Sequence, residues 1–347
     1  MKKSLLALAV LSAFAGAAQA QTNVTIYGSF NAGLRSVNNV DAAGNSRLSM
    51  GSNGTYSSNR IGFKGVEDLG GGMNAHFTLE TGFNTGTGAL DNANNQLFQR
   101  SAYVGLGGAW GSVDLGRQYS VNFKTIGGYD PFSYKYTGII PVAAQGGLTR
   151  LNNDIQYTGA FGPVTVRAEY ALGEVAGDTS AGATAAVGAG VKTGPFSFGG
   201  AYTTRANATD TADQNVWTVG GAFVTGPFRI AAGYANDDRD AGFGVAPGAV
   251  VAFETKDAWI GATYSITPAM ALQAGYYQTK VEATGVSGRR NLAIVGATYN
   301  LSKRTTLHAD VDFARFKGTS LATYSPFAAP AGQNRVTGIS VGINHTF

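Results

Sequence analysis

Apolar and polar side chains alternate along most of the chain, which is the pattern of a β-strand with two different surroundings. In residues 23–35 the two alternating sets are Val24, Ile26, Gly28, Phe30, Ala32, Leu34 and Thr25, Tyr27, Ser29, Asn31, Gly33, Arg35. The same period of two runs through residues 304–313 and through residues 339–347, where the sequence finishes on an aromatic residue. After residue 20 no stretch of useful length has a helical period. The alternation therefore predicts an all-β fold.

A repeat of 32 residues describes how these strands are connected. Gly-Pro pairs stand at residues 162–163, 194–195 and 226–227, and Tyr170, Tyr202 and Tyr234 keep the same spacing. Each repeat holds two strands of roughly ten residues, which is the length that a tilted strand needs to cross a membrane. Propeller blades hold four strands in a longer period. The repeat therefore favours a meander of membrane-spanning hairpins.

Short and long connections alternate along the whole chain. The short turns fall near residues 69–72, 108–110, 161–163, 194–195, 226–227, 267–268 and 302–304. The long loops fall near residues 37–57, 84–94, 119–149, 173–181, 206–213, 237–253, 282–287 and 317–333. Seven short and eight long connections join sixteen strands. All short turns then lie at one end and all long loops at the other, which is typical of an outer-membrane barrel and not of a soluble sandwich.

The two faces of the strands indicate where water and lipid lie. One face carries Thr, Ser, Asn, Gln and charged residues, and is too polar for the core of a soluble sandwich. The other carries aliphatic residues and glycine, with Tyr or Phe near strand ends, as at a membrane interface. A closed barrel also leaves no backbone donor unpaired in lipid. The pattern predicts a 16-stranded antiparallel transmembrane β-barrel with short periplasmic turns and long extracellular loops.

The first residues and the composition refine this picture. Residues 1–20 have a charged start, an apolar stretch and the cleavage site Ala18-Gln19-Ala20, so we expect a secretory signal peptide followed by a barrel domain at residues 21–347. Removing Lys2 and Lys3 lowers Lys+Arg from 25 to 23 against 21 acidic residues, a net charge of +2. That surplus is too small to predict a nucleic-acid partner. The chain contains no cysteine, which excludes disulfides, thiol catalysis and Cys-based metal sites.

Four stretches in order resemble the general diffusion porins of Gram-negative outer membranes, of the proteobacterial sixteen-stranded type. They read "NVTIYGSFNAGL", "SSNRIGFKGVEDLGGGMNAHFTLETGF", "RSAYVGLGGAWGSVDLGRQY" and, at the terminus, "GISVGINHTF". The resemblance implies a homotrimer in the cell outer membrane, in which each subunit holds a water-filled pore and the third long loop, residues 119–149, folds inward. It also implies contact with outer-membrane lipid and lipopolysaccharide.

The terminal Phe347 has two interpretations. The resemblance implies that it is a signal for the outer-membrane assembly machinery. It is equally typical of an aromatic girdle at the membrane interface. Both interpretations place the last strand beside the first, where the barrel closes.

The expected functional site is an electrostatic constriction. The inward loop carries Lys124, Asp130 and Lys135. The resemblance places a basic cluster on the opposite wall, for which the candidates are Arg60, Arg100 and Arg150, eight to twelve residues before the periplasmic turns of the second, fourth and sixth strands.

Strand phase supports this placement and adds further residues. Arg60 shares its phase with Lys64, opposite Ile61 and Phe63, so both cations are expected in the lumen. Arg100 is in phase with Ala102, and Arg150 with Asn152 and Asp154. Arg35 shares the phase of Ser29 and Asn31 and extends the basic ladder upward. Arg117 falls on the outward phase with Val113 and Leu115, where the resemblance suggests a subunit interface.

These residues predict passive diffusion of ions and small hydrophilic solutes with a mild preference for anions. Rings or patches of Arg and Lys favour anions in pores, and a loop with one acid against two lysines supplies no strong negative pole. Field focusing in a narrow neck lets a few local charges exceed the effect of the net charge. No cofactor, metal or catalytic residue is expected.

Two alternatives belong to other classes. An outer-membrane lipase or protease would need a catalytic histidine. Of the three histidines, His76 and His308 face the lumen low in their strands and His345 takes the lipid phase, so we expect wall residues. A channel specific for sugars or phosphate is closer. Six loop aromatics could form a sugar slide or could instead fix the loop to the wall: Tyr119, Phe123, Tyr129, Phe132, Tyr134 and Tyr136.

Overall fold

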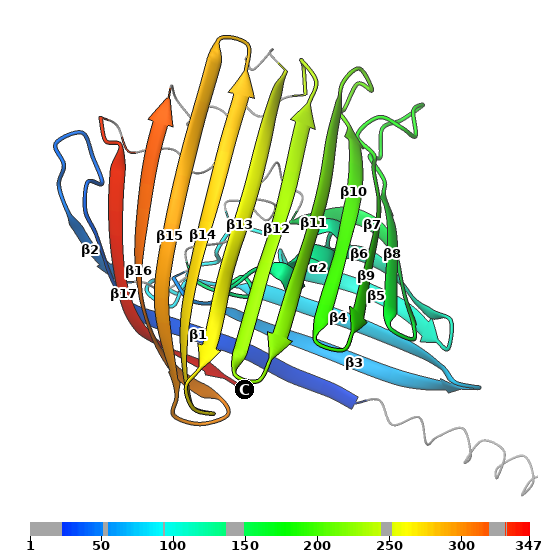
Figure 1. Ribbon diagram of the computed structural model, residues 1–347. Helices are drawn as coiled ribbons and strands as arrows, with labels where there is room; N and C mark the ends of the chain where they lie inside the picture. The colour runs from blue at the N-terminus through cyan, green and yellow to red at the C-terminus, as the bar shows by residue number, and fades with distance from the viewer. Residues whose placement is uncertain are drawn as a thin grey trace, which may run out of the picture.

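A single antiparallel sheet closes on itself to form the barrel in the computed structural model (Figure 1). The structure describes residues 23–50, 55–92, 94–136, 149–243, 252–318, 330 and 332–347. The expected signal peptide and the second part of the inward loop, residues 137–148, lie outside the described residues.

Sixteen strands span the barrel, which confirms the predicted number. In chain order they are β1 (Asn23–Val37), β3 (Arg60–Gly70), β4 (Met73–Gly82), β5 (Ser101–Gly108), β6 (Gly111–Tyr119), β7 (Arg150–Phe161), β8 (Val164–Ala171), β9 (Thr184–Thr193), β10 (Phe196–Ala206), β11 (Asp213–Thr225), β12 (Phe228–Arg239), β13 (Phe253–Ser265), β14 (Met270–Ala283), β15 (Val286–Asn300), β16 (Thr305–Gly318) and β17 (Arg335–Thr346). The seventeenth strand of the sheet, β2 (Arg47–Met50), is a short piece of the first long connection that pairs with the end of β1.

The first and last strands close the barrel. The first half of β1 pairs with β3, from Asn23↔Val66 to Ser29↔Arg60, and its second half pairs with β17, from Ser29↔Thr346 to Val37↔Gly338. At the end of this seam the backbones of Gly28 and Phe347 exchange two hydrogen bonds of 3.3 Å. Each of the sixteen spanning strands therefore has two neighbours, and in the part of the chain that the structure describes the barrel leaves no open edge toward lipid.

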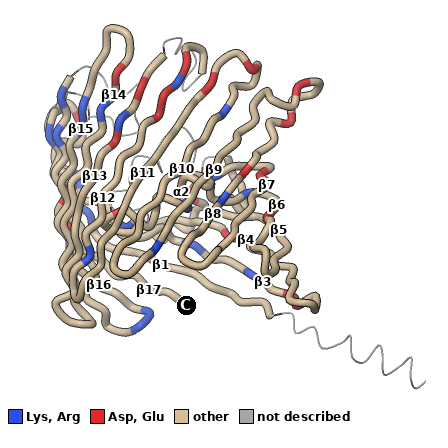
Figure 2. Tube along the Cα trace, turned by 45° about the vertical axis from the view of Figure 1, so that its right-hand side comes forward, with Lys and Arg blue, Asp and Glu red and all other residues tan. Residues whose placement is uncertain are grey.

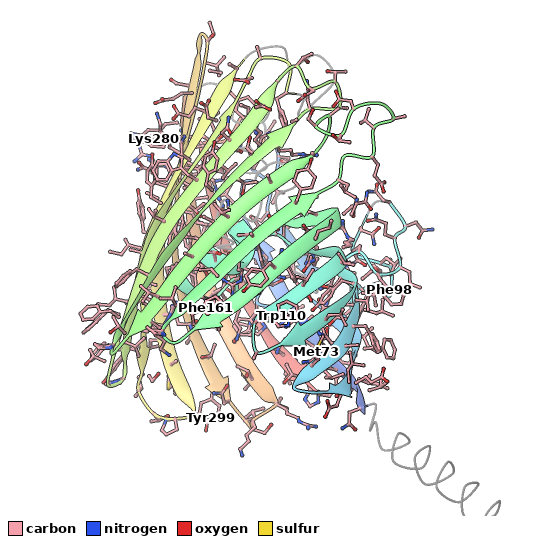
Figure 3. All side chains as sticks on the ribbon, turned by 90° about the vertical axis from the view of Figure 1, so that its right-hand side faces the viewer. Met73, Phe98, Trp110, Phe161, Lys280 and Tyr299 are labelled. Carbon is pink, nitrogen blue, oxygen red and sulfur yellow. The ribbon has the colours of Figure 1, made fainter. Side chains whose placement is uncertain are left out.

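The alternation in the sequence becomes an outer and an inner surface. On β1 the large apolar side chains Val24, Ile26 and Leu34 are each more than half exposed, whereas Ser29 and Asn31 are buried inside. Aromatic side chains such as Trp110, Phe161 and Tyr299 lie near the short-turn rim (Figure 3). This polar interior and apolar exterior fit lipid outside and water inside.

One predicted loop is wrong. Residues 282–287 form a two-residue turn, because β14 ends at Ala283, β15 begins at Val286, and these two residues pair directly. Gly285 has φ +73°, a conformation that tight hairpin turns require and that glycine adopts without strain. The hairpin continues beyond the apolar part of the outer surface, where its outward side chains include Lys280 and Arg289.

The third long loop enters the barrel, as predicted. After β6 it forms α2 (Val121–Ile126) and a 3₁₀ turn at Gly127–Tyr129, and α2 lies inside the ring of strands (Figure 1). Ser120 caps α2 by accepting a hydrogen bond from the Phe123 N–H at 3.2 Å. Val121 packs against Ala186 and Ala201 of the inner wall. Among the described residues, no helix has the length and apolar character that crossing a membrane requires.

Small wall residues make room for the loop. A Cβ atom added to Gly220 (β11), Gly261 (β13), Gly275 (β14) or Gly296 (β15) would come within 2.6 to 2.9 Å of Tyr129, Pro131, Phe132 and Tyr136, in that order. Each loop side chain thus lies directly on a wall glycine. Tyr129, Phe132 and Tyr136 are buried in the same apolar cluster as the wall residues Trp259 and Leu292.

Candidate functional site: the basic neck of the barrel

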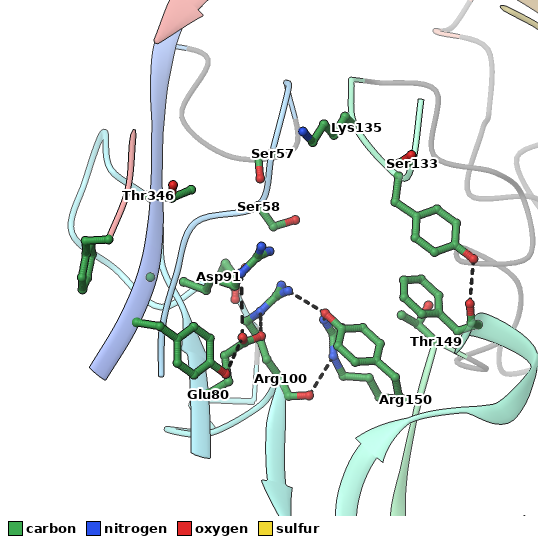
Figure 4. A pocket seen from close by; sticks show the side chains of 17 residues that line it. Ser57, Ser58, Glu80, Asp91, Arg100, Ser133, Lys135, Thr149, Arg150 and Thr346 are labelled. Atoms are coloured by element: carbon green, nitrogen blue, oxygen red, sulfur yellow. Dashed lines mark hydrogen bonds and ion pairs between the residues drawn. The ribbon is translucent and has the colours of Figure 1, made fainter. Parts of the chain in front are cut away.

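Three arginines from alternate strands line one cavity of about 790 Å³ (Figure 4). Arg60 begins β3, Arg100 directly precedes β5 and Arg150 begins β7. The pairing of neighbouring strands brings them together, since Arg60 pairs with Gly82 on β4 and Arg150 pairs with Tyr119 on β6. The predicted basic cluster therefore exists as one group.

The Tyr119 hydroxyl holds two of these arginines. It accepts hydrogen bonds of 2.6 Å from Nη2 of Arg100 and of 2.6 Å from Nη2 of Arg150. The guanidinium carbon of Arg150 also lies 4.2 Å from the centre of the Tyr119 ring, within the range of a cation–π contact. Arg150 Nε donates to the Arg100 carbonyl at 3.0 Å. Two positive charges are thus fixed side by side with a neutral hydroxyl between them.

Glu80 on β4 supplies the counter-charge. Its carboxylate accepts from Arg100 Nε at 2.6 Å and from the Tyr27 hydroxyl at 2.9 Å, and Arg60 Nε is 3.8 Å away. The sequence-based site omitted this residue. Strand phase does place Glu80 in the lumen, because Glu80 shares the phase of His76. Its contact with the arginines could not be predicted, because that contact depends on the pairing of three strands.

Lys135 is the loop cation that faces the cavity. Its side chain is exposed, and Nζ donates to the Tyr56 hydroxyl at 3.2 Å and lies 5.0 Å from the centre of that ring. The charged residues lining the cavity are four cations, Arg60, Arg100, Arg150 and Lys135, and two acids, Glu80 and Asp91. The formal charge of the lining is therefore +2.

The other two loop charges are in different places from those predicted. Asp130 is fully buried, and its Oδ2 accepts from the backbone N–H of Tyr134 at 2.7 Å and of Phe132 at 3.1 Å. Its Oδ1 accepts from the Tyr277 hydroxyl at 2.8 Å. Burial raises the pKa of Asp130 to about 6. The prediction that Asp130 lies in the ion path is wrong, because this carboxylate stabilises a loop turn against the wall.

Lys124 is also outside the cavity. Its Nζ donates to Gln118 Oε1 at 3.0 Å and to Gln156, against the wall formed by β6 and β7. Burial lowers the pKa of Lys124, and the nearby carboxylates of Asp114 and Asp154 act in the opposite direction. The prediction that Lys124 lies in the ion path is also wrong, because α2 turns this side chain toward the wall.

The loop aromatics divide into two sets of three. Tyr129, Phe132 and Tyr136 are buried against the wall. The other three line the cavity as one stack, with ring centres 4.6 Å apart for Tyr119 and Phe123 and 4.2 Å apart for Phe123 and Tyr134.

Comparison with known proteins assigns the chain to a family. The family model described as "Gram-negative porin" matches residues 7–319. The chain belongs to the Gram-negative porins. "Outer membrane porin protein 32" of Delftia acidovorans is 33% identical, and an outer membrane porin protein of Bordetella pertussis is 29% identical, each over the whole of both chains.

Solved structures agree with this assignment. The "Anion-selective porin from Comamonas acidovorans" superposes with a TM-score of 0.80 at 27% identity, covering 94% of this chain and all of the other. OmpT of Vibrio cholerae, at 16% identity and a TM-score of 0.70, shares the fold. The protein is therefore an outer-membrane porin located in the cell outer membrane.

Two further lumen cations of this porin lie apart from the cavity. Arg35 faces the lumen, as its phase predicts, but Nη1 lies 2.7 Å from Asp312 Oδ2 and donates to Ser340 Oγ at 2.7 Å. The charge of Arg35 is therefore compensated by Asp312. The prediction that Arg35 extends the group of basic wall residues upward is wrong. Lys64 is exposed, with Nζ 5.5 Å from the centre of the Tyr27 ring. Neither residue is part of the cavity lining.

An irregularity between β6 and β7 alters one phase. Gly116 pairs with Asp154 but Gln118 pairs with Leu151, and Asn153 has φ +53°. The extra residue turns Asn152 outward, where it is exposed and hydrogen-bonds Arg117. The predicted common phase of Arg150 and Asn152 is wrong, because a bulge shifts the alternation by one residue.

Arg117 itself is half-buried, and its Nε donates to the Gln99 carbonyl at 2.6 Å. Its role at a subunit interface stays a prediction.

The lumen histidines have structural partners. His76 Nε2 lies 2.7 Å from Asp114 Oδ1. His308 Nε2 is 2.8 Å from Asn31 Nδ2, and the His308 ring stacks on Tyr56 with centres 4.5 Å apart. Through these contacts His76 and His308 bind other residues of the barrel wall and, for His308, the ring of Tyr56.

Proposed function

We propose that this porin forms a water-filled channel for passive diffusion of ions and small hydrophilic solutes, with a mild preference for anions. The observation that carries the proposal is the +2 surplus of charge in the cavity that Arg60, Arg100, Arg150 and Lys135 line. Patches of Arg and Lys in a neck favour anions, and the low-dielectric wall focuses their field. The similar porin from Comamonas acidovorans is described as anion-selective, which supports the same sign here.

The preference is mild because part of the positive charge is compensated. Glu80 contacts Arg100 and lies near Arg60, whereas Arg150 and Lys135 form no ion pair with a carboxylate of the described residues. Fields from such charges also decay over a Debye length of about 8 Å at physiological salt. These charges therefore act mainly on ions that pass within about that distance of them.

A sugar-specific channel is less well supported. Sugars bind to exposed aromatic faces, but in this cavity the faces contact one another or a guanidinium. Phe123 is stacked between Tyr119 and Tyr134, and the cation of Arg150 lies over Tyr119. A conductance that saturates and is blocked by added sugar would favour this alternative.

We also propose a homotrimer with lipopolysaccharide around it, inserted by the outer-membrane assembly machinery. The outward contact between Arg117 and Asn152 is consistent with a polar patch at a subunit interface. Light scattering of the detergent-purified protein measures the number of subunits. A single-subunit mass would exclude the trimer.

Selectivity should depend on the three wall arginines. Replacing Arg60, Arg100 or Arg150 by alanine removes one positive charge from the neck, so the chloride-over-potassium preference should fall in bilayer reversal potentials under a salt gradient. The Arg150→Ala effect should be the largest, because Arg60 and Arg100 lie next to Glu80.

Lys303→Gln is the matched control for charge, because Lys303 is an exposed cation at a turn on the short-turn rim. Its reversal potential should match that of the wild type. An unchanged reversal potential in all three arginine variants would remove these residues from the selectivity site.

A further inference from the structure

The extracellular end of the barrel carries positive charge on its outer surface. The residues are Lys280 on β14, Arg289 on β15, Arg315 and Lys317 on β16 and Arg335 on β17, which together we call the outer basic band. Figure 2 shows blue segments gathered where β14 and β15 approach the loop end, and Figure 3 places Lys280 on the opposite rim from Tyr299.

The band faces outward and takes no part in the neck. On β14 the alternate residues Thr279 and Val281 are buried inside, whereas Lys280 between them is exposed. On β16 the buried Ala314 faces inward and its neighbour Arg315 is exposed. These cations therefore contact whatever surrounds the barrel.

Strand pairing puts like charges directly opposite one another. Lys280 pairs with Arg289, Arg289 pairs with Lys317, and Arg315 pairs with Arg335. Side chains at such positions have Cβ atoms about 4.5–5.5 Å apart, and like charges there destabilise a sheet. An arrangement of this kind is stabilised by an anion bound between the cations.

The described residues supply little counter-charge. None of their ion pairs includes a cation of the band, and the acids nearest to it in the strand pairing, Glu254 on β13 and Glu282 on β14, both pair with Lys256 Nζ, at 2.6 and 3.1 Å. The segments outside the described residues, 244–251 and 319–329, contain no Asp or Glu in the sequence. The anion must therefore come from outside the chain or from another copy of it.

A shallow cavity of about 300 Å³ lies within the band. Lys280, Arg289 and Lys317 line it together with Ser287 and the backbone of Gly288 and Gly318. Three cations and a hydroxyl around one cavity match the donors that phosphate oxygens accept from. Val281 and Glu282 also line it, and the Glu282 carboxylate accepts a hydrogen bond of 3.1 Å from Lys256 Nζ.

The height of Lys280, Arg289 and Lys317 fits a lipid headgroup, whereas Arg315 lies only two residues from the outward Phe313. Lys280 lies four residues beyond the outward Tyr276, and Arg289 lies four residues from the outward Ala293. At about 3.3 Å per residue along a tilted strand, this is roughly 10 Å above the last large apolar contact. The headgroup layer begins at that level.

We propose that the outer basic band binds the phosphate groups of the outer-leaflet glycolipid, lipopolysaccharide, with the principal site between Lys280, Arg289 and Lys317. The site rests on the proposed lipopolysaccharide contact and is independent of ion selectivity in the pore. Its charge and position hold the glycolipid against β14, β15 and β16.

Binding of bisphosphorylated lipid A to the detergent-purified porin tests the site by native mass spectrometry and by titration. Lys280→Gln/Arg289→Gln/Lys317→Gln should weaken binding by about 100-fold at low ionic strength, since a basic residue near an anionic surface contributes about fivefold. Dephosphorylated lipid A should bind to the wild type no more tightly than phosphorylated lipid A binds to the triple variant. Added salt should weaken wild-type binding the most.

Lys303→Gln/Arg304→Gln on the short-turn rim is the control, and it should bind lipid A as wild type does. Single-channel conductance and reversal potential of the triple variant should remain at wild-type values, which separates this site from the neck and reports a folded barrel. Equal binding by the triple variant and wild type, or equal binding of phosphorylated and dephosphorylated lipid A, would overturn the proposal. Self-association of the purified porin that is lost in the triple variant, with lipid A binding unchanged, would assign the band to a second copy of the chain instead.

Discussion

At the scale of the residue, two carboxylates near the neck act in opposite ways. Glu80 remains close to the arginines and reduces the field that an ion meets. Asp130 has no exposed surface and accepts three hydrogen bonds that hold the loop. A carboxylate therefore reduces the positive charge of the cavity at Glu80 and stabilises the loop backbone at Asp130. The difference follows from the complete burial of Asp130.

The anchoring by Asp130 should depend on pH. Its folded-state pKa, about 6, lies above the ordinary value of 3.8, because burial disfavours the ionised form. The resulting stabilisation is fully present below about pH 4 and is lost as the pH rises through about 6. In urea unfolding, Asp130→Asn should remove up to about 3 kcal/mol of the stability difference between pH 4 and pH 7.5.

Tyr277→Phe is the companion variant. It removes one hydrogen bond to Asp130 and should cost about 1 kcal/mol at pH 7.5. Because that hydrogen bond lowers the pKa of Asp130, the carboxylate of the variant should still titrate, with a higher pKa. The same pH dependence in wild type and Asp130→Asn would show that this carboxylate does not titrate in the folded loop over the range.

At the scale of the element, the inward loop is bound to the barrel wall along several neighbouring strands, β11 to β15. It is held by packing of Tyr129, Phe132 and Tyr136 on wall glycines and by Arg229, whose Nη2 donates to the Gly128 carbonyl at 2.6 Å. The indole N–H of Trp259 donates to the Tyr129 carbonyl at 2.9 Å. Side chains and backbone thus both contribute to the anchoring.

Adding a side chain to one of these glycines should loosen the loop. A Cβ at Gly220 would come within 2.7 Å of Tyr129, so Gly220→Val forces the loop away from β11 at a cost of about 1–3 kcal/mol. Single-channel recordings should show more current noise and brief closures, and the thermal midpoint should fall. In the control, Gly128→Ala, the new methyl group meets nothing within 4 Å, and both quantities should stay at wild-type values.

Sequence predicted the strands well and the loop only in outline. Phase alone placed Arg60 in the lumen and Arg117 outside, because alternation is a local property of a strand. It placed Asn152 wrongly, since the bulge at Asn153 leaves no clear mark in the sequence. The position of Asp130 depends on Tyr277, which is 147 residues away, and such a contact follows only from the closed barrel.

At the scale of the whole molecule, closure joins the two ends of the described chain. Phe347 stacks on Phe30 with ring centres 5.3 Å apart, and its backbone pairs with Gly28. Alternation predicted the last strand, and the closure of the barrel predicted its neighbour. The two-residue turn at residues 284–285 was missed, because a loop and a hairpin that continues into water have similar polar sequences.

Phe347→Ala should separate the two interpretations of the terminal ring. It keeps the two backbone hydrogen bonds to Gly28, so the purified variant should refold in detergent. If the ring is an assembly signal, as we expect, unassembled chain should accumulate in cells. Phe161→Ala, which removes an exposed girdle ring from the same rim, is the control and should assemble normally. Normal assembly of both variants in cells would leave Phe347 as a girdle residue.

The neck has two sides that belong to different arcs of the barrel. The arginines stand on β3 to β7, whereas the loop that carries Lys135 is fastened to wall residues on β11 to β15. The gap between them is therefore a chord of the barrel cross-section, set by the number and tilt of the strands. A relative that kept every residue of the neck but had one more hairpin in its barrel would have a wider pore. The width of the pore is therefore set by the number of strands, and its ion preference by the side chains.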